Sequence, residues 1–141
     1  MPSLPPARAC LFAEQVRPEL GGKSTIIGFA GIAPHVIIDI ESYPMQINFC
    51  AFLLCEEAKS DVPFQLEVET EGPLGNILPR TKVEIPKVKA GKTVSCAFNF
   101  GAFPIAALGT YKVRVYSEGF VHSEHSFKVR LATKESTDLQ N

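Results

Sequence analysis

Apolar and polar residues alternate along most of this chain, and turn-forming residues break the alternation every ten to fifteen residues. Successive side chains of a β-strand point to opposite faces, so a period of two indicates half-buried strands. No segment of the sequence shows the period of an amphipathic helix. Many short strands without helices between them predict an all-β sandwich or barrel.

The positions of glycine and proline predict where the strands end. We expect turns at residues 72–76 and 117–120, and we expect Pro86 to stop the strand that precedes it. Residues 16–19 are too polar and proline-broken for a tight hairpin, which predicts a longer loop, and residues 103–108 are expected to make one helical turn. The strand pattern occurs eight or nine times, in residues 7–14, 23–30, 36–40, 47–55, 64–69, 83–85, 94–100, 111–116 and 127–131.

The last two strands favour a sandwich over a barrel. Gly109-Thr110-Tyr111 opens the penultimate strand, and a glycine hairpin leads into the final one. In many immunoglobulin-like domains a tyrosine near a strand start anchors the corner of the closing hairpin, although the tryptophan of antibody cores is missing here. The sequence therefore predicts an immunoglobulin-like antiparallel β-sandwich of eight or nine strands. Residues 1–131 would form this single domain, and residues 132–141 a polar, frayed tail.

The bulk composition limits the partners that we expect. The chain has 141 residues, of which 45% are hydrophobic and 21% charged, with a formal net charge of −1. Proteins that bind nucleic acid neutralise phosphates with a basic excess, so we expect no nucleic-acid partner. No apolar run is long enough for a membrane helix, and the first eleven residues lack a secretory signal pattern. We therefore expect a cytoplasmic protein with no membrane partner.

Four cysteines occur, at positions 10, 50, 55 and 96, and no two have the spacing of a zinc ribbon or a thioredoxin-like site. Their even number makes disulfides possible. Because each lies in an apolar strand pattern and no signal peptide is visible, the favoured interpretation is free, buried thiols.

The block from Ala9 to Lys23, which reads LFAE-x-VR-x-E-x-GGK from Leu11, resembles the opening of a family of small uncharacterised bacterial and phage-encoded proteins. Gly109, Thr110, Tyr111 and Val115 resemble the closing GTY-x-x-x-V strand of the same family. The resemblance lies at the two ends of the chain. It implies a cytoplasmic, microbial β-sandwich and carries no activity with it.

The histidines do not have the spacing of a metal site. His122 and His125 are three residues apart, so on a regular strand they would point to opposite faces. His125 has the parity of Phe127 and is expected at the edge of the core, whereas His122 has the parity of Glu124 and is expected on the solvated face. We therefore expect no metal.

No catalytic motif appears in the sequence. Gly-x-Ser-x-Gly and the phosphate-binding glycine motifs are missing, and the cysteines lie within strands rather than at exposed elbows. Glu56 and Glu57 are adjacent on a strand and would diverge, whereas two catalytic carboxylates must face each other. We expect neither an enzyme nor a cofactor, although a site assembled from distant strands stays open as an alternative.

A cluster of charged residues flanks the first loop, namely Glu14, Arg17, Glu19 and Lys23. It can be a recognition patch, because loops on a rigid sandwich often carry binding residues, or only a local lattice of ion pairs. The favoured function is a non-enzymatic protein-interaction or assembly module. A small-ligand or carbohydrate-binding domain is the alternative, which the lack of tryptophan weakens.

Residues 47–55 carry apolar side chains on both faces, since Cys50, Phe52 and Leu54 alternate with three further apolar residues. In a two-sheet sandwich only one face of each sheet meets the core. The second apolar face therefore needs a cover. The sequence leaves two candidates open: a second copy, which would make a homodimer, or residues 31–44 of the same chain, where Val36, Ile37, Ile38 and Ile40 would fold over that sheet.

Overall fold

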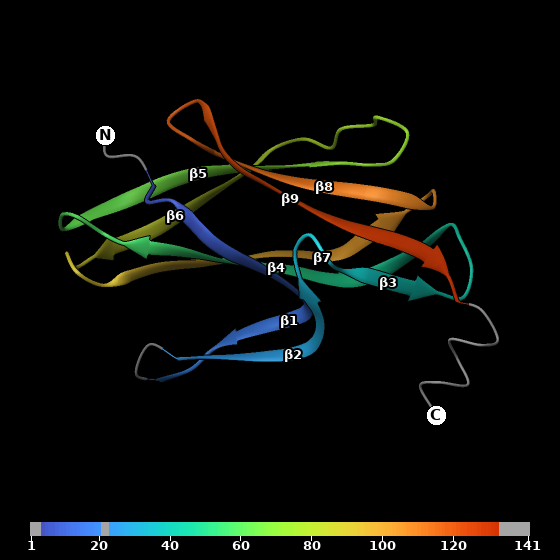
Figure 1. The fold of residues 1–141 in the computed structure, drawn as a ribbon, viewed down its shortest axis with the longest axis horizontal. Helices are drawn as coiled ribbons and strands as arrows, with labels where there is room; N and C mark the ends of the chain where they lie inside the picture. The colour runs from blue at the N-terminus through green and yellow to red at the C-terminus, as the bar shows by residue number, and fades with distance from the viewer. Residues whose placement is uncertain (1–3, 21–22, 133–141) are drawn as a thin grey trace.

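The computed structural model describes residues 4–20 and 23–132, and within them it contains nine strands. Figure 1 shows the strands arranged in two layers. Their bounds are β1 (Ala7–Pro18), β2 (Ser24–Ile32), β3 (Ile37–Ile40), β4 (Met45–Glu57), β5 (Val62–Glu71), β6 (Thr81–Val88), β7 (Thr93–Ile105), β8 (Gly109–Ser117) and β9 (Phe120–Leu131).

The strands form two sheets that face each other. Sheet A has four strands in the order β2-β1-β4-β7, and sheet B has five in the order β3-β9-β8-β5-β6. All neighbours are antiparallel except β3 and β9, which run parallel with Ile37 opposite Lys128. The predicted all-β sandwich is confirmed, with this one parallel pair as a departure from the expected antiparallel pattern.

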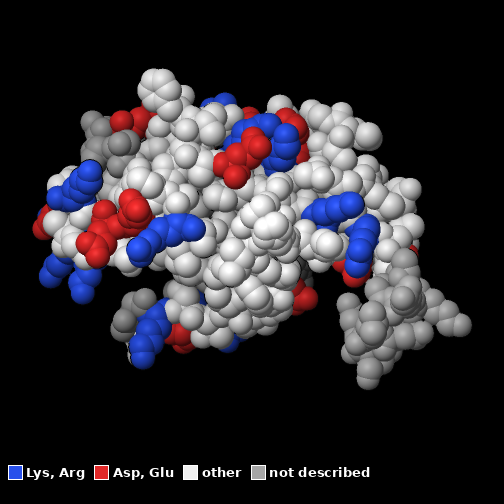
Figure 2. All heavy atoms as spheres, viewed as in Figure 1, with Lys and Arg blue, Asp and Glu red and all other residues white. Residues whose placement is uncertain are grey.

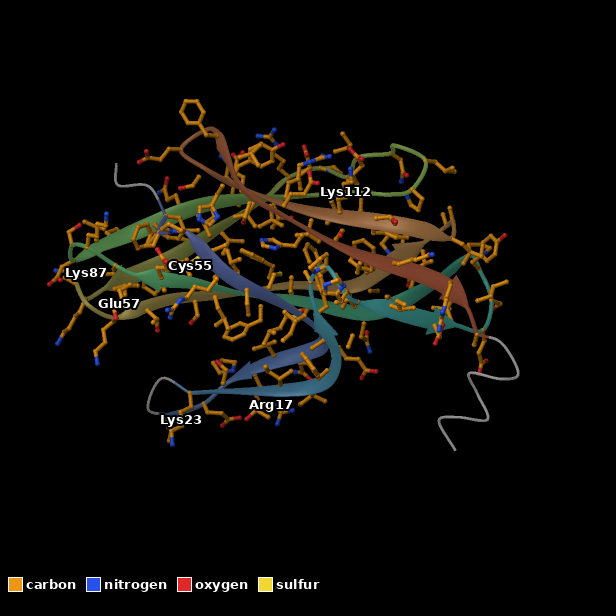
Figure 3. The ribbon with its side chains drawn as sticks, in the orientation of Figure 1. Arg17, Lys23, Cys55, Glu57, Lys87 and Lys112 are labelled. Carbon is orange, nitrogen blue, oxygen red and sulfur yellow. The ribbon has the colours of Figure 1, made fainter. Side chains whose placement is uncertain are left out.

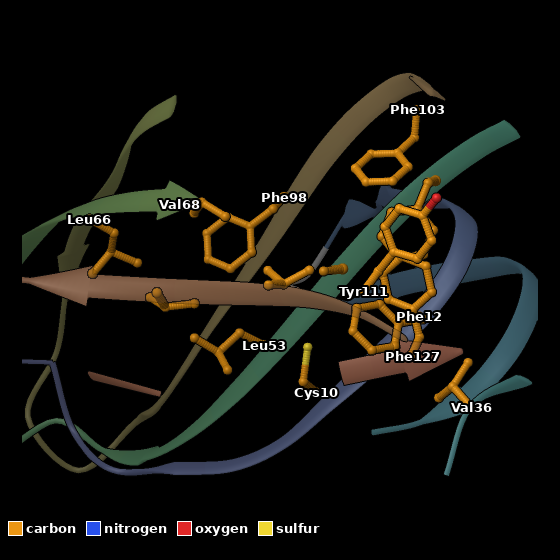
Figure 4. Packing of buried hydrophobic residues seen from close by; sticks show 14 of the residues in the cluster. Cys10, Phe12, Val36, Leu53, Leu66, Val68, Phe98, Phe103, Tyr111 and Phe127 are labelled. Atoms are coloured by element: carbon orange, nitrogen blue, oxygen red, sulfur yellow. The ribbon is translucent and has the colours of Figure 1, made fainter. Parts of the chain in front are cut away.

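The core lies between the two sheets and is rich in aromatic side chains (Figure 4). Phe49 of β4 packs against Phe127 of β9 with ring centroids 4.6 Å apart, and Phe12 of β1 lies 5.1 Å from Phe127. Tyr111 of β8 stacks on Phe127 at 5.3 Å. Because each buried aromatic ring removes a large apolar area from water, this cluster locks the two sheets together.

The closing hairpin has the predicted geometry. The hydroxyl of Tyr111 donates a hydrogen bond of 2.6 Å to the carbonyl of Ala107, across the corner that precedes β8. Glu118 and Gly119 connect β8 to β9, and both have positive φ. A two-residue turn needs this backbone conformation for its twist to match the twist of the two strands it joins. The tyrosine corner and the glycine hairpin are immunoglobulin-like features, and the prediction of this fold class is confirmed.

The first hairpin is longer than the sequence suggested. β1 continues to Pro18, which pairs with Ser24, so the longer loop predicted at residues 16–19 is wrong. Arg17 and Pro18 lie at the exposed end of the hairpin, where backbone pairing does not require alternating burial. The Gly21-Gly22 turn and most of the predicted polar tail lie outside the described residues.

Prolines did not end the strands that contain them. β6 continues through Pro86 to Val88, and β7 continues through Pro104, so the predicted helical turn at residues 103–108 is also wrong. Both strands lie at sheet edges, where an N–H group that faces away from the sheet has no strand to pair with. A proline can therefore stand there without the loss of a sheet hydrogen bond. Phe103 and Ile105 are buried in the core and hold the end of β7 in the sheet.

Most of the segment left open as a cover for β4 lies against the other sheet, whereas Gly31 and Ile32 end β2 of sheet A. β3 pairs with β9, and Val36 and Ile40 are buried between the sheets. Residues 31–44 therefore do not cover the second apolar face of β4, and that prediction is wrong. Phe52 and Leu54 remain half-buried.

β1 bends sharply after Ala13. It pairs with β4 only as far as Ala13, which lies opposite Cys50. The backbone amide of Val16 nevertheless lies close enough to Cys50 to lower the pKa of its thiol, against the larger effect of burial. A straight strand would carry Val16 about 10 Å beyond Ala13, so the chain must turn back over β4. Figure 1 shows this reversal of β1.

Candidate functional site

The outer face of sheet B, which points away from the core, is covered with charge. Core residues such as Leu66 and Val68 alternate with the carboxylates of β5, and directly paired residues share a face. Figure 2 shows charged side chains gathered over this layer. The charged residues of this face are Asp39, Glu67, Glu69, Glu71, Lys82, Glu84, Lys112, Arg114, Glu124, Lys128 and Arg130.

Arg114 of β8 lies at the centre of an ion-pair network on this face. Its guanidinium binds Glu124 on β9 at 2.7 Å, and Glu71 and Glu69 on β5 at 3.0 and 3.1 Å. These carboxylates raise the pKa of Arg114. The network joins three neighbouring strands and satisfies the charges of its members within the chain.

Glu69 is the buried member of the network. It accepts hydrogen bonds from Arg114, Arg80 and the Tyr116 hydroxyl. Burial would raise the pKa of this carboxyl, but the three donors outweigh it and hold the pKa below its usual value. The Arg80 guanidinium also lies 3.7 Å above the Tyr116 ring, so one face of that ring is already covered.

The outer face of sheet A is different, because its middle rows, from Gln46 to Leu54 of β4, carry no charge, and its charged paired residues Arg17 and Glu57 lie towards its ends. Its side chains are those that alternate with the core residues Phe49, Ala51 and Leu53 of β4, together with their partners on neighbouring strands. The paired rows consist of Ile32, Leu11, Phe52 and Ala97; of Phe29, Ala13, Cys50 and Asn99; of Ala9, Leu54 and Ser95; of Asn48 and Ala102; and of Gln46 and Pro104.

Five large side chains form what we call the apolar band: Leu11, Phe29, Ile32, Phe52 and Leu54. Phe29 exposes 57% of its surface and Ile32 exposes 51%. The other three are half-buried. Figure 2 shows an area without charged side chains over the bend of β1 and the end of β2. An exposed apolar surface of this kind marks interaction sites in soluble proteins.

Sequence reasoning identified the half of the band on β4 and missed the half on β2. The pattern of residues 23–30 predicts an ordinary half-buried strand and does not single out Phe29. The signal was present, since the run from Ser24 to Ile38 contains no Asp, Glu, Lys or Arg. A strand at a sheet edge normally carries such charges.

The structure spreads the predicted recognition patch along the first hairpin. Glu14 and Arg17, three residues apart on β1, lie on opposite faces, and the Glu14 side chain covers Gly28. Glu19 accepts a hydrogen bond from the Thr25 hydroxyl at 3.1 Å, and its N–H donates to the Lys23 carbonyl. Within residues 4–20 and 23–132, no ion pair joins any two of Glu14, Arg17, Glu19 and Lys23. Arg17 and Lys23 lie near the free end of the hairpin (Figure 3).

The histidines are arranged differently from the prediction. A register shift between β8 and β9 makes His122 an extra residue, so it does not share the solvated face of Glu124. His122 instead contacts the Pro5 carbonyl at 2.6 Å and the Ser123 hydroxyl at 2.9 Å, and the same hydroxyl contacts His125. Burial lowers the pKa of His125, and His122 lowers it further. This chain of contacts ties the N-terminal segment to β9.

The four cysteines are free thiols, and three of them are buried, with Cys96 half-buried. Burial raises the pKa of Cys10 to about 12, of Cys55 to about 11 and of Cys96 to about 12. Burial also raises the pKa of Cys50. Thiols of this kind stay protonated at neutral pH and are poor nucleophiles.

A groove of about 750 Å³ lies on the outer side of sheet B. Its walls include Glu67, Lys82, Glu84 and Tyr116, the last being an aromatic ring that Arg80 already covers on one face. In the described part of the chain, no three His, Cys, Asp or Glu side chains group as a metal site would require. The described residues also contain no helix that could span a membrane.

Comparison with known proteins adds little beyond the fold. Among solved structures, the chain is similar to an immunoglobulin-like protein from Pseudomonas aeruginosa, with a TM-score of 0.41 and 16% sequence identity. That alignment covers 89% of this chain and 92% of that chain. No protein-family model and no curated protein matches the chain. The resemblance of residues 9–23 to a bacterial and phage family stays a prediction.

Proposed function

We propose that the domain is a non-enzymatic module that binds another protein through the apolar band on the outer face of sheet A. The observation that carries this proposal is the contrast between the two outer faces. Sheet B meets water with a network of ion pairs, as an outer face of a sandwich normally does. Sheet A presents Phe29 and Ile32 with more than half of their surface exposed.

The two alternative functions have weaker support. A carbohydrate site needs an aromatic ring that a sugar can stack on, and the Tyr116 ring in the sheet B groove is stacked against Arg80. An enzyme needs a nucleophile that faces a cavity. Ser123 touches His122 and His125, but it lines neither the groove on sheet B nor the two smaller cavities beside Phe103.

Site-specific photo-crosslinking in the cells that make the protein tests the proposal. Phe29 and Phe120 are both exposed phenylalanines, the first in the band and the second at the β8–β9 turn. Each is replaced in turn by the photoreactive analogue benzoylphenylalanine. We expect a discrete covalent adduct from position 29 and much less from position 120. Equal yields from the two positions, or no adduct from position 29, would overturn the proposed function.

A further inference from the structure

We propose that the sandwich has a second binding site, in the cavity between the edge strands β6 and β7, for a small uncharged molecule that carries a ring and one hydrogen-bonding group. We call this cavity the edge cavity. The inference goes beyond the proposed function, because residues of β5, β6 and β7 that face the space between the sheets line the edge cavity, whereas the apolar band lies on the outer face of sheet A.

The edge cavity opens where the two sheets are not joined. β6 ends sheet B and β7 ends sheet A, so no backbone ladder connects these two strands. Residues 72–80 close part of the gap, and the N–H of Leu78 donates to the Thr70 carbonyl at 3.0 Å. The Arg80 guanidinium, bound by two carboxylates of β5 and stacked on the Tyr116 ring, holds the end of this segment. These contacts fix the wall that Leu78 contributes.

The size of the edge cavity suits a small molecule. Its volume is about 350 Å³, which lies within the range of ligand pockets in proteins. A cavity of about 180 Å³ adjoins it, and the two share Thr70, Leu78, Phe103 and Pro104 as wall residues. The space is too small for a folded partner.

Three phenylalanines of β7 line the edge cavity, because β7 contains a bulge. The pairing of β4 with β7 shifts by one residue between Phe49 and Cys50, which makes Phe100 an extra residue. Phe98 and Phe103 are five residues apart and both are nevertheless buried between the sheets (Figure 4). With Phe100 they form an aromatic wall. Aromatic rings pack well against another ring, so this wall favours a ligand that carries one.

The walls of the edge cavity also favour an uncharged ligand. In the described part of the chain, its lining contains no Asp, Glu, Lys or Arg, whereas the groove on sheet B is lined by Glu67, Lys82 and Glu84. An ion that left water for the edge cavity would find no opposite charge there. Because such a transfer is costly, the cavity should discriminate against charged molecules.

Thr70 is the polar residue of the edge cavity that calls for an explanation. It continues the core-facing row of Leu66 and Val68 on β5, and only 6% of its surface is exposed. The structure buries two other polar residues among those it describes, and both have partners. Glu69 binds three donors, and the Ser117 hydroxyl accepts from the N–H of Leu4 at 3.2 Å.

The Thr70 hydroxyl, in contrast, has no hydrogen-bond partner within residues 4–20 and 23–132. Its oxygen is not sealed in the core, because every fully buried side-chain oxygen or nitrogen of these residues has a partner. Thr70 lines both cavities, so the hydroxyl meets the space that a ligand would occupy. Hydroxyls in the interior of a protein are nearly always hydrogen-bonded. A hydroxyl or amine group on the ligand would supply the missing partner.

Fluorescence titration with N-phenyl-1-naphthylamine, an uncharged aromatic amine that emits more strongly in apolar surroundings, tests the inference. Wild type should bind the dye saturably. Leu78→Glu places a charge in the wall that both cavities share and should abolish binding. Leu20→Glu, at an exposed leucine of the first hairpin, and Phe29→Lys, in the apolar band, should bind as wild type. Circular dichroism confirms folding, and Thr81→Glu, at an exposed position of the same cavity, replaces Leu78→Glu if that variant does not fold.

Competition against the bound dye tests the chemical class of the ligand. 2-Naphthol and 2-naphthoate have the same rings, but only the second is charged at pH 7. We expect 2-naphthol to displace the dye at a concentration at least about tenfold lower than 2-naphthoate. Thr70→Val keeps the shape of the side chain and should bind 2-naphthol about two- to tenfold more weakly, with no loss of stability. Thr110→Val, at an exposed threonine of β8, is the matched control and should bind as wild type.

The inference would be overturned by the absence of saturable dye binding, by binding that Leu78→Glu leaves unchanged, or by equal displacement with 2-naphthol and 2-naphthoate. Equal affinity of Thr70→Val and wild type for 2-naphthol would also overturn it, because the hydroxyl would then contact only water. These outcomes are independent of the proposed function, which the adduct at position 29 tests on another face of the sandwich.

Discussion

Phe29 of β2 lies directly opposite Ala13 of β1, and its ring is mostly exposed while Ala13 is buried. Ala13 in turn lies opposite Cys50, which is fully buried beneath the bend of β1 at Val16. The chain thus covers the middle of its second apolar face by bending one of its own strands. Phe29, paired with Ala13 on the side away from Cys50, stays mostly exposed.

Tyr111→Phe tests the tyrosine corner. The change removes the hydroxyl that donates to Ala107 at 2.6 Å but keeps the ring that stacks on Phe127. We expect the free energy of unfolding to fall by about 0.5–1.5 kcal/mol in a urea titration. Tyr43→Phe, at an exposed tyrosine, serves as the control and should change stability by less than about 0.5 kcal/mol. Equal effects of the two changes would mean that the corner does not stabilise the fold.

Glu69→Gln tests the ion-pair network of sheet B. The donors around Glu69 hold its pKa below the usual value, so its contribution to stability is complete above about pH 5 and disappears as the pH falls through the lowered pKa. We expect the variant to lose about 1–3 kcal/mol at pH 7 and to depend less on acid than wild type.

The matched control for this change is Glu84→Gln, which removes an exposed carboxylate from the same face. Its stability at pH 7 should stay within about 0.5 kcal/mol of wild type. Chemical denaturation of all three proteins at pH 7 and pH 4 gives the comparison. If Glu69→Gln lost as much stability in acid as wild type, the carboxylate would not be stabilised by its three donors.

The cysteines should be reduced and unreactive in the folded protein. Burial raises the pKa values of all four thiols, so few thiolates form at pH 8. We expect a disulfide-exchange reagent to react slowly with the native protein and to count four thiols in denaturant without reductant. A count below four in denaturant would reveal a disulfide and contradict the interpretation of free thiols.

The alternation of apolar and polar residues was sufficient to predict the strands and the corner at Tyr111. It failed where tertiary pairing overrides local composition. Pro86 and Pro104 lie at sheet edges, where an N–H is not needed, so they did not stop their strands. Parity failed at His122, because a register shift inserts one extra residue and no single-strand pattern encodes it.

In the candidate site, too, the sequence predicts what depends on local alternation and not what depends on tertiary pairing. The two apolar faces of β4 were visible in the sequence, because side-chain alternation depends only on neighbouring residues. Whether residues 31–44 would cover Phe52 could not be predicted, since it depends on which sheet β3 joins. The structure places β3 beside β9 in sheet B, and the outer face of sheet A stays uncovered by it.

The most direct measurement of the central claim is oxidative footprinting by hydroxyl radicals, in the cells that make the protein and in dilute purified protein. Phe29 and Phe120 are again the matched pair, because both rings are exposed in the folded chain. If the apolar band binds a protein, Phe29 should be oxidised in the dilute sample and protected in cells, while Phe120 is oxidised in both. Equal oxidation of Phe29 in the two samples would contradict the claim.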